Sequence, residues 1–85
     1  MTVEARLEKI KALMQRATNK PVPELAVESR FADLGLESID RIRVIIALER
    51  EFNVEIDEIA ARQLQTMGDL LAHIAGGRKR RRPPA

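Results

Sequence analysis

Ser38 is the residue of this chain whose setting could support chemistry, because it follows the turn-forming segment 33–35 and precedes a helical pattern. A serine at a helix start can cap the helix by accepting backbone N–H groups. It can also act as a nucleophile, or a separate enzyme can modify its accessible hydroxyl. A phosphodiester on that hydroxyl would lie in the positive field of the helix N-terminus. The residues alone favour the cap, although Arg41 stands where a capping box needs Glu or Gln.

Catalysis by this serine is disfavoured by its possible partners. His73 is the only histidine, and no strand–turn–helix pattern surrounds Ser38 as it does the serine of hydrolases. Cysteine is absent, so the chain has no thiolate nucleophile and no cysteine metal site. We therefore predict no catalytic residue and no metal ligand.

Length and charge set the broad class. A chain of 85 residues with 45% hydrophobic but only 2% aromatic residues predicts one domain with an aliphatic core. The net charge of +2 is concentrated in residues 78–82, which hold five of the 15 basic residues, so residues 1–77 carry a net charge of −3. The start has neither a signal peptide nor a transmembrane pattern, and a cytoplasmic protein is expected.

Helical spacing of apolar residues runs along most of the chain. It predicts a first helix whose apolar pattern runs from Val3 to Ala17, with Thr2 as its N-cap, ended by Asn19, Pro21 and Pro23. A connection of about twenty residues to Glu37 should be pinned to the core. Its apolar anchors are Leu25, Val27, Phe31 and Leu34.

The remaining elements are also predicted to be helical. A second helix spans 38–52, and Asp57 caps a brief helical turn through Arg62. Thr66 and Asp69 form a capping-box-like start of a last helix that stops at 76–77. The fold class is an all-α, small four-helix bundle with a long loop between helices 1 and 2 and a short third helix. The bundle covers 1–76, and 77–85 is expected to be a disordered basic tail.

The second helix has two apolar sides. At about 100° per residue, one stripe groups on the side expected to face the core, and the other on the opposite side. The core stripe is Val44, Ile45, Leu48 and Phe52. The second stripe is Ile39, Ile42 and Ile46, flanked by Arg43 and Arg50 along one edge and by Asp40 and Glu49 beyond. Helical pattern alone leaves the second stripe equally suited to burial or to partner binding.

A family resemblance covers most of these features. Residues 31–52, "FADLGLESIDRIRVIIALEREF", resemble the core of the acyl carrier protein family, with its Asp-Leu-Gly turn, modified serine and Ala-Leu-Glu-x-x-Phe helix end. Residues 54–74 continue the likeness through "VEI" and a "T-x-G-D-L" start of the last helix. The resemblance implies a carrier rather than an enzyme, and it favours an exposed second stripe.

The resemblance also implies a prosthetic group and partners. Ser38 would bear 4'-phosphopantetheine, installed by a phosphopantetheinyl transferase, whose thiol carries acyl groups to acyl-transferring or acyl-processing enzymes. The bundle can shelter an acyl chain between its helices. The flanking attachment motif maps onto Asp33, Leu34, Gly35, Glu37 and Ile39. The partner-binding surface maps onto Ile39, Asp40, Ile42, Arg43, Ile46, Glu49 and Arg50.

Three departures from the family pattern stand out. Glu37 replaces the usual Asp before the serine, and arginines replace much of the acidity of the recognition helix. We therefore expect dedicated partners in specialised fatty-acid, lipid or polyketide biosynthesis. Arg41 lies near the core-facing stripe, so its head must reach solvent at the loop edge or pair with Glu28 or Asp33.

Alternatives to this function remain. A peptidyl or aminoacyl carrier shares the serine and its arm, whereas an unmodified helical adaptor would bind a partner through the isoleucine stripe. The tail is either simply solvated or a contact for anionic lipid or an acidic partner. Nucleic acid is not expected, because the body lacks aromatic residues for stacking and a basic recognition face. A monomer is expected.

Overall fold

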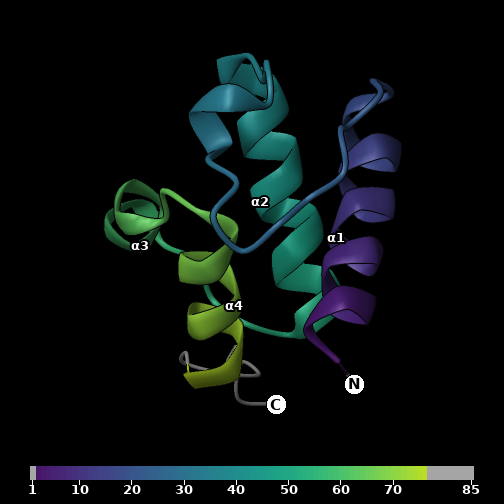
Figure 1. Cartoon of the computed structure of the whole chain (residues 1–85). Coiled ribbons are helices and arrows are strands. Elements are labelled where there is room, and N and C mark those ends of the chain that lie inside the picture. The colour runs from purple at the N-terminus through teal and green to yellow at the C-terminus, as the bar shows by residue number, and fades with distance from the viewer. Residues whose placement is uncertain (1, 77–85) are drawn as a thin grey trace.

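Two antiparallel helices form the frame of the molecule. In the computed structural model, which describes residues 2–76, α1 (Val3–Thr18) packs along α2 (Ser38–Phe52). The short helix α3 (Glu58–Gln63) and the last helix α4 (Met67–Gly76) complete the bundle beside α2 (Figure 1). The predicted four-helix architecture is confirmed.

Helix ends follow from local side-chain chemistry. Thr2 Oγ1 accepts the Ala5 N–H at 3.1 Å, which confirms the predicted cap of α1. Asn19 and Asn53 end α1 and α2 in the left-handed conformation, with φ of 56° and 53°. At the start of α3, Asp57 Oδ1 accepts the Ala60 N–H at 2.8 Å.

The start of α4 carries the predicted capping box. Thr66 Oγ1 accepts the Asp69 N–H at 3.1 Å, and Asp69 Oδ2 accepts the Thr66 N–H at 3.0 Å. The N–H groups of Thr66 and Gln65, which both donate to this carboxylate, lower the pKa of Asp69. Gly76 is the last residue of α4, whereas Gly77 and the predicted tail 77–85 lie outside the described residues.

The core is aliphatic, as the composition predicts. Its buried members come from α1, α2 and α4 and from the connections between the helices. They are Leu7, Ile10, Leu13, Met14, Val22, Leu25, Phe31, Val44, Leu48, Val54, Ile56, Leu64, Met67, Leu70 and Ile74. The link after α2 contributes Val54 and Ile56, so this extended segment is part of the core rather than a surface loop.

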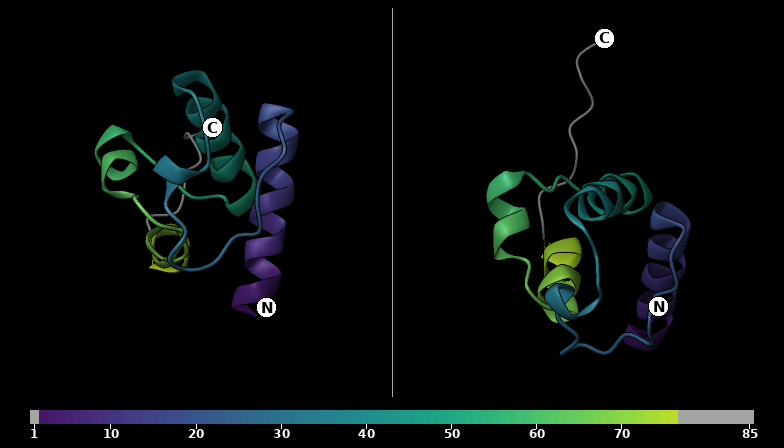
Figure 2. Two further views of the ribbon diagram at one scale, coloured as in Figure 1. Left: turned by 45° about the horizontal axis from the view of Figure 1, so that its top comes forward. Right: turned by 90° about the horizontal axis from the view of Figure 1, so that it is seen from above.

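The loop between α1 and α2 crosses the bundle before it returns to the start of α2 (Figures 1 and 2). It meets the start of α4 in an isolated antiparallel bridge between Arg30 and Thr66. Three backbone N–H···O bonds reinforce this contact: Phe31 to Gln65 at 2.9 Å, Met67 to Ser29 at 2.9 Å and Gly68 to Val27 at 2.8 Å. The loop is therefore fixed by its backbone as well as by its apolar residues.

One predicted anchor of this loop is wrong. Leu25 and Phe31 are buried and Leu34 is half-buried, but Val27 is 45% exposed. The Val27 carbonyl accepts the Gly68 N–H, and its side chain lies over Gly68, where an added Cβ would come within 2.9 Å of Val27 Cγ1. Val27 therefore contributes its backbone carbonyl to the contact with α4, while its side chain stays at the surface.

Candidate functional site: the start of helix α2

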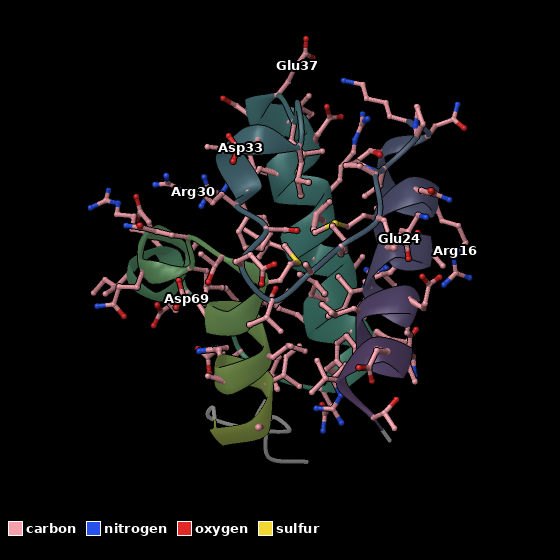
Figure 3. All side chains as sticks on the ribbon, in the orientation of Figure 1. Arg16, Glu24, Arg30, Asp33, Glu37 and Asp69 are labelled. Atoms are coloured by element: carbon pink, nitrogen blue, oxygen red, sulfur yellow. The ribbon has the colours of Figure 1, made fainter. Side chains whose placement is uncertain are left out.

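Ser38 is the first residue of α2 and is exposed. The preceding turn begins with the 3-10 turn Phe31–Asp33 and passes through Gly35, whose φ of +71° is the conformation that glycine adopts without strain. Phe31 anchors this turn in the core, while Asp33 and Glu37 lie at the end of the molecule where α2 begins (Figure 3). The turn thus presents the Ser38 hydroxyl to solvent on a supported backbone.

The interpretation of Ser38 as the helix cap is wrong. Glu37 occupies the N-cap position, with extended backbone dihedrals, and its N–H donates to Asp40 Oδ2 at 3.1 Å. Asp40, three positions after Glu37, completes this capping box, which therefore begins one residue before Ser38. The Ser38 hydroxyl is consequently free of the capping role.

Asp40 ties the start of α2 to the end of α1. Its side chain is buried and binds the Lys20 ammonium just beyond α1, and Lys20 Nζ also lies 3.9 Å from Glu37 Oε2. The Lys20 hydrogen bond, and then the Glu37 N–H, hold the pKa of the Asp40 carboxyl below its usual range. The same hydrogen bond raises the pKa of the Lys20 ammonium.

The burial of Asp40 corrects its predicted role. With 2% of its surface exposed, Asp40 is a structural residue and is not available to a docking partner. Glu49 is half-buried, and its Oε2 accepts the Ile56 N–H at 2.9 Å, which fastens the link after α2. Glu51 forms an ion pair with Lys9 of α1 at 3.3 Å. All three carboxylates of α2 are therefore engaged within the fold.

The second apolar stripe of α2 is exposed. Ile39, Ile42 and Ile46 are 49%, 54% and 45% exposed. Arg43 and Arg50 are exposed as well, and among the ion pairs found within residues 2–76 none joins either of them to a carboxylate. This surface, which we call the isoleucine face, has an apolar centre and a basic edge.

A groove lies between α2 and α3 and begins at Ser38. Its volume is about 630 Å³, and its apolar wall includes Ile42, Ile45 and Ile56. Arg41 and Arg62 supply cationic groups at the groove, where Arg62 is paired with Glu58 at 2.9 Å. An extended chain attached to the Ser38 oxygen would have this groove beside it.

Arg41 lies beside the groove in an arrangement that the sequence did not specify. Its Nη2 donates to the carbonyls of Ala61 at 3.0 Å and Leu64 at 3.4 Å, and its Cζ lies 5.7 Å from the centre of the Phe31 ring. The predicted ion pair with Glu28 or Asp33 is not among those found within residues 2–76, because α3 carbonyls bind the guanidinium instead. The expectation that the head reaches the surface is correct, since Arg41 is exposed.

The other potential chemistry of the described chain is sparse. His73 Nε2 lies 2.8 Å from the Glu55 carbonyl, so the single histidine connects α4 to the link before α3. No cluster of three or more metal-ligating side chains forms within residues 2–76. In the same part of the chain, no helix has the length and apolar character needed to cross a membrane.

Comparison with known proteins connects this geometry to a family. Residues 8–74 match the family described as "Phosphopantetheine attachment site". The chain is also 35% identical over 69 residues to "Acyl carrier protein 3" of Ralstonia nicotianae, a match that covers 80% of this chain and 79% of that protein. The chain belongs to the acyl carrier protein family. Members of this family are carriers and not catalysts, and their cofactor is 4'-phosphopantetheine.

The site of this acyl carrier protein fits such a group. The attachment chemistry requires an accessible hydroxyl, and Ser38 supplies one that no capping role withdraws. The N-terminus of the 15-residue helix α2 favours the negative charge of a phosphodiester. Acyl carrier proteins in general meet a phosphopantetheinyl transferase and acyl-processing enzymes.

Proposed function

We propose that Ser38 is the attachment residue of this acyl carrier protein and that Asp33, Leu34, Gly35, Glu37 and Ile39 form the motif around it. The observation that carries the proposal is the exposed Ser38 hydroxyl at the first position of α2, with Glu37 in the N-cap position. The arm would hold acyl groups as thioesters and present them to dedicated enzymes of specialised fatty-acid, lipid or polyketide biosynthesis. The proposal places a monomer in the cytoplasm, the setting expected of the family.

The attachment step is a phosphoryl transfer from coenzyme A. The Ser38 oxygen forms a bond to the phosphorus that carries the pantetheine, the bond from that phosphorus to the bridging oxygen breaks, and adenosine 3',5'-bisphosphate leaves. The hydroxyl proton is taken up by a base of the transferase or by solvent. This chain contributes the oxygen and the positive end of α2 and needs no catalytic group of its own.

Intact-mass measurement after coexpression with a broad-specificity phosphopantetheinyl transferase tests the proposal. We expect wild type to gain the mass of one phosphopantetheine group and Ser38→Ala to gain none. The matched control is Ser29→Ala, which alters the only other serine and should still be loaded. A wild-type protein that stays unmodified, or a loaded Ser38→Ala variant, would overturn the assignment.

We further propose that the isoleucine face docks partner enzymes whose binding sites are apolar at the centre and acidic at the edge. The charges support this choice, because the three carboxylates of α2 are engaged within the fold while Arg43 and Arg50 are exposed. A basic partner surface would meet like charges here, which slows association and weakens binding. Dedicated partners are thus better suited to this face than enzymes with basic carrier-binding sites.

A further inference from the structure

Arg41 connects α2 to α3 at the point where an acyl chain could enter the bundle. It lies three residues after Ser38, about one helical turn along α2, and its guanidinium reaches the last carbonyls of α3. The Ala61 carbonyl lacks a helical partner, because the Gln65 N–H that would bond it donates to Asp69 Oδ2 at 3.1 Å. Arg41 supplies the missing donor, so the contact satisfies both groups.

The space behind Arg41 is almost completely filled. Phe31, Val44, Leu48 and Leu64 surround a void of about 10 Å³, with Arg41 itself on its wall. Such a volume holds about one water molecule at most and has no room for a chain of methylene groups. The open groove of about 630 Å³ lies on the other side of the same arginine and includes Ser38. Arg41 lines both spaces, together with Ile45 and Ala61, and is the one charged side chain at the boundary between the accessible groove and the closed interior.

An alkyl chain would have to displace Arg41 to reach the interior. Displacement breaks the bonds to the Ala61 and Leu64 carbonyls and moves the guanidinium off the Phe31 ring. The bond to Leu64 is partly buried, so displacement would leave the Leu64 carbonyl without a donor next to an apolar chain, which is unfavourable. A long alkyl chain would gain from burial in proportion to its length, whereas a short or polar acyl group gains little.

We infer that Arg41 is a specificity-determining latch, which keeps the interior between α2 and α3 closed and holds the acyl group of the Ser38 arm in the open groove. The inference rests on the proposed attachment at Ser38. It assigns to this carrier acyl groups that are short or bear polar substituents, since these do not depend on a buried chain. The groove supports such groups with an apolar wall and with the charge of Arg41, which is bound to neutral carbonyls rather than to a carboxylate.

The test compares butyryl and decanoyl forms of the full-length protein, loaded from the corresponding acyl-coenzyme A by a promiscuous transferase and verified by intact mass. Far-ultraviolet circular dichroism then gives the thermal midpoint of each form. In wild type, the two midpoints should agree within about 1 °C, because neither chain enters the core. Arg41→Met keeps an apolar stem but removes the donor, and its decanoyl form should melt about 5 °C or more above its butyryl form. Arg16→Met, the same change at an exposed position of α1, should show midpoints that agree as in wild type.

Amide chemical shifts provide a readout that does not depend on the stability of any variant. In wild type, the amides of Val44, Leu48 and Leu64 should have the same shifts in the butyryl and decanoyl forms. Chain-length-dependent shifts of these amides, or a decanoyl form of wild type that is stabilised as much as that of Arg41→Met, would overturn the latch. So would a folded Arg41→Met variant with equal midpoints. Failure to gain mass at the loading step instead overturns the assignment of Ser38, and the latch with it.

Discussion

The two apolar sides of α2 should respond very differently to the same truncation. Leu48 is 1% exposed, whereas Ile46, two residues earlier, is 45% exposed. Leu48→Ala removes three buried carbon groups at about 0.8 kcal/mol each. The cavity left behind adds to this loss, which gives a total of about 3–4 kcal/mol. A domain of this size has a free energy of unfolding of roughly 4–11 kcal/mol, so Leu48→Ala removes a large part of it.

Ile46→Ala should cost much less. About half of its side chain is already in water, which reduces the lost burial to roughly 1 kcal/mol. The better helix propensity of alanine returns about 0.4 kcal/mol, so the net loss should be below about 1 kcal/mol. Ile46→Ala should also accept phosphopantetheine normally while its turnover with a dedicated partner enzyme falls.

Urea unfolding followed by far-ultraviolet circular dichroism measures both variants. Circular dichroism is the suitable probe, because the chain contains neither tryptophan nor tyrosine. Equal destabilisation by Leu48→Ala and Ile46→Ala would refute the division of α2 into a core side and a docking side. The division would also be refuted if Leu48→Ala left the free energy of unfolding unchanged and Ile46→Ala left the turnover with partner enzymes unchanged.

Three further outcomes are expected. Gly35→Ala should lower the free energy of unfolding by about 1 kcal/mol, because φ is +71° and space around the added Cβ is open, so backbone strain is the main cost. The pKa values of the Asp40 and Asp69 carboxyls are lowered in the folded state, so their contribution to stability is present above the unfolded pKa of about 3.9 and is lost as pH falls below it. Changing both residues to asparagine should therefore weaken the dependence of the urea midpoint on pH between about pH 5 and pH 2. Arg43→Glu with Arg50→Glu should raise kcat/KM with a housekeeping fatty-acid ketosynthase about tenfold at low salt, and added salt should reduce this gain.

Each of these outcomes has a matched control. Gly35→Asn tolerates the left-handed conformation better and should cost less than Gly35→Ala. Glu28→Gln, an exposed loop change, should leave the acid dependence of the urea midpoint as in wild type. Arg16→Glu with Arg30→Glu alters the net charge equally at two exposed positions outside α2, and should leave the ketosynthase rate near its wild-type value. An unchanged rate for the α2 variant would contradict the proposed effect of the basic edge.

The helices could be predicted from the sequence because their ends are set by neighbouring residues. Thr2, Asp57 and the Thr66–Asp69 pair act within three residues along the chain, and all three caps are confirmed. The predicted bounds 38–52 of the second helix are those of α2. Local chemistry and apolar spacing were sufficient for these features.

Features that depend on distant contacts could not be obtained in this way. The inward position of Asp40 depends on Lys20, twenty residues earlier, and the position of Arg41 depends on the carbonyls of Ala61 in α3 and of Leu64 just after it. Helical spacing gives the side of α2 on which a residue lies, but not the group from another element that it meets. Glu37 was also missed as the N-cap, because the serine beside it is the more usual capping residue.

The contact between the loop and the start of α4 has a consequence for the timing of maturation. Val27, Ser29 and Phe31 each form a backbone hydrogen bond to residues 65–68, which leave the ribosome much later. The segment before Ser38 therefore cannot settle into its final shape until nearly all of the described chain has been synthesised. An enzyme that recognises this settled shape would meet finished chains only, and products of premature termination would escape it.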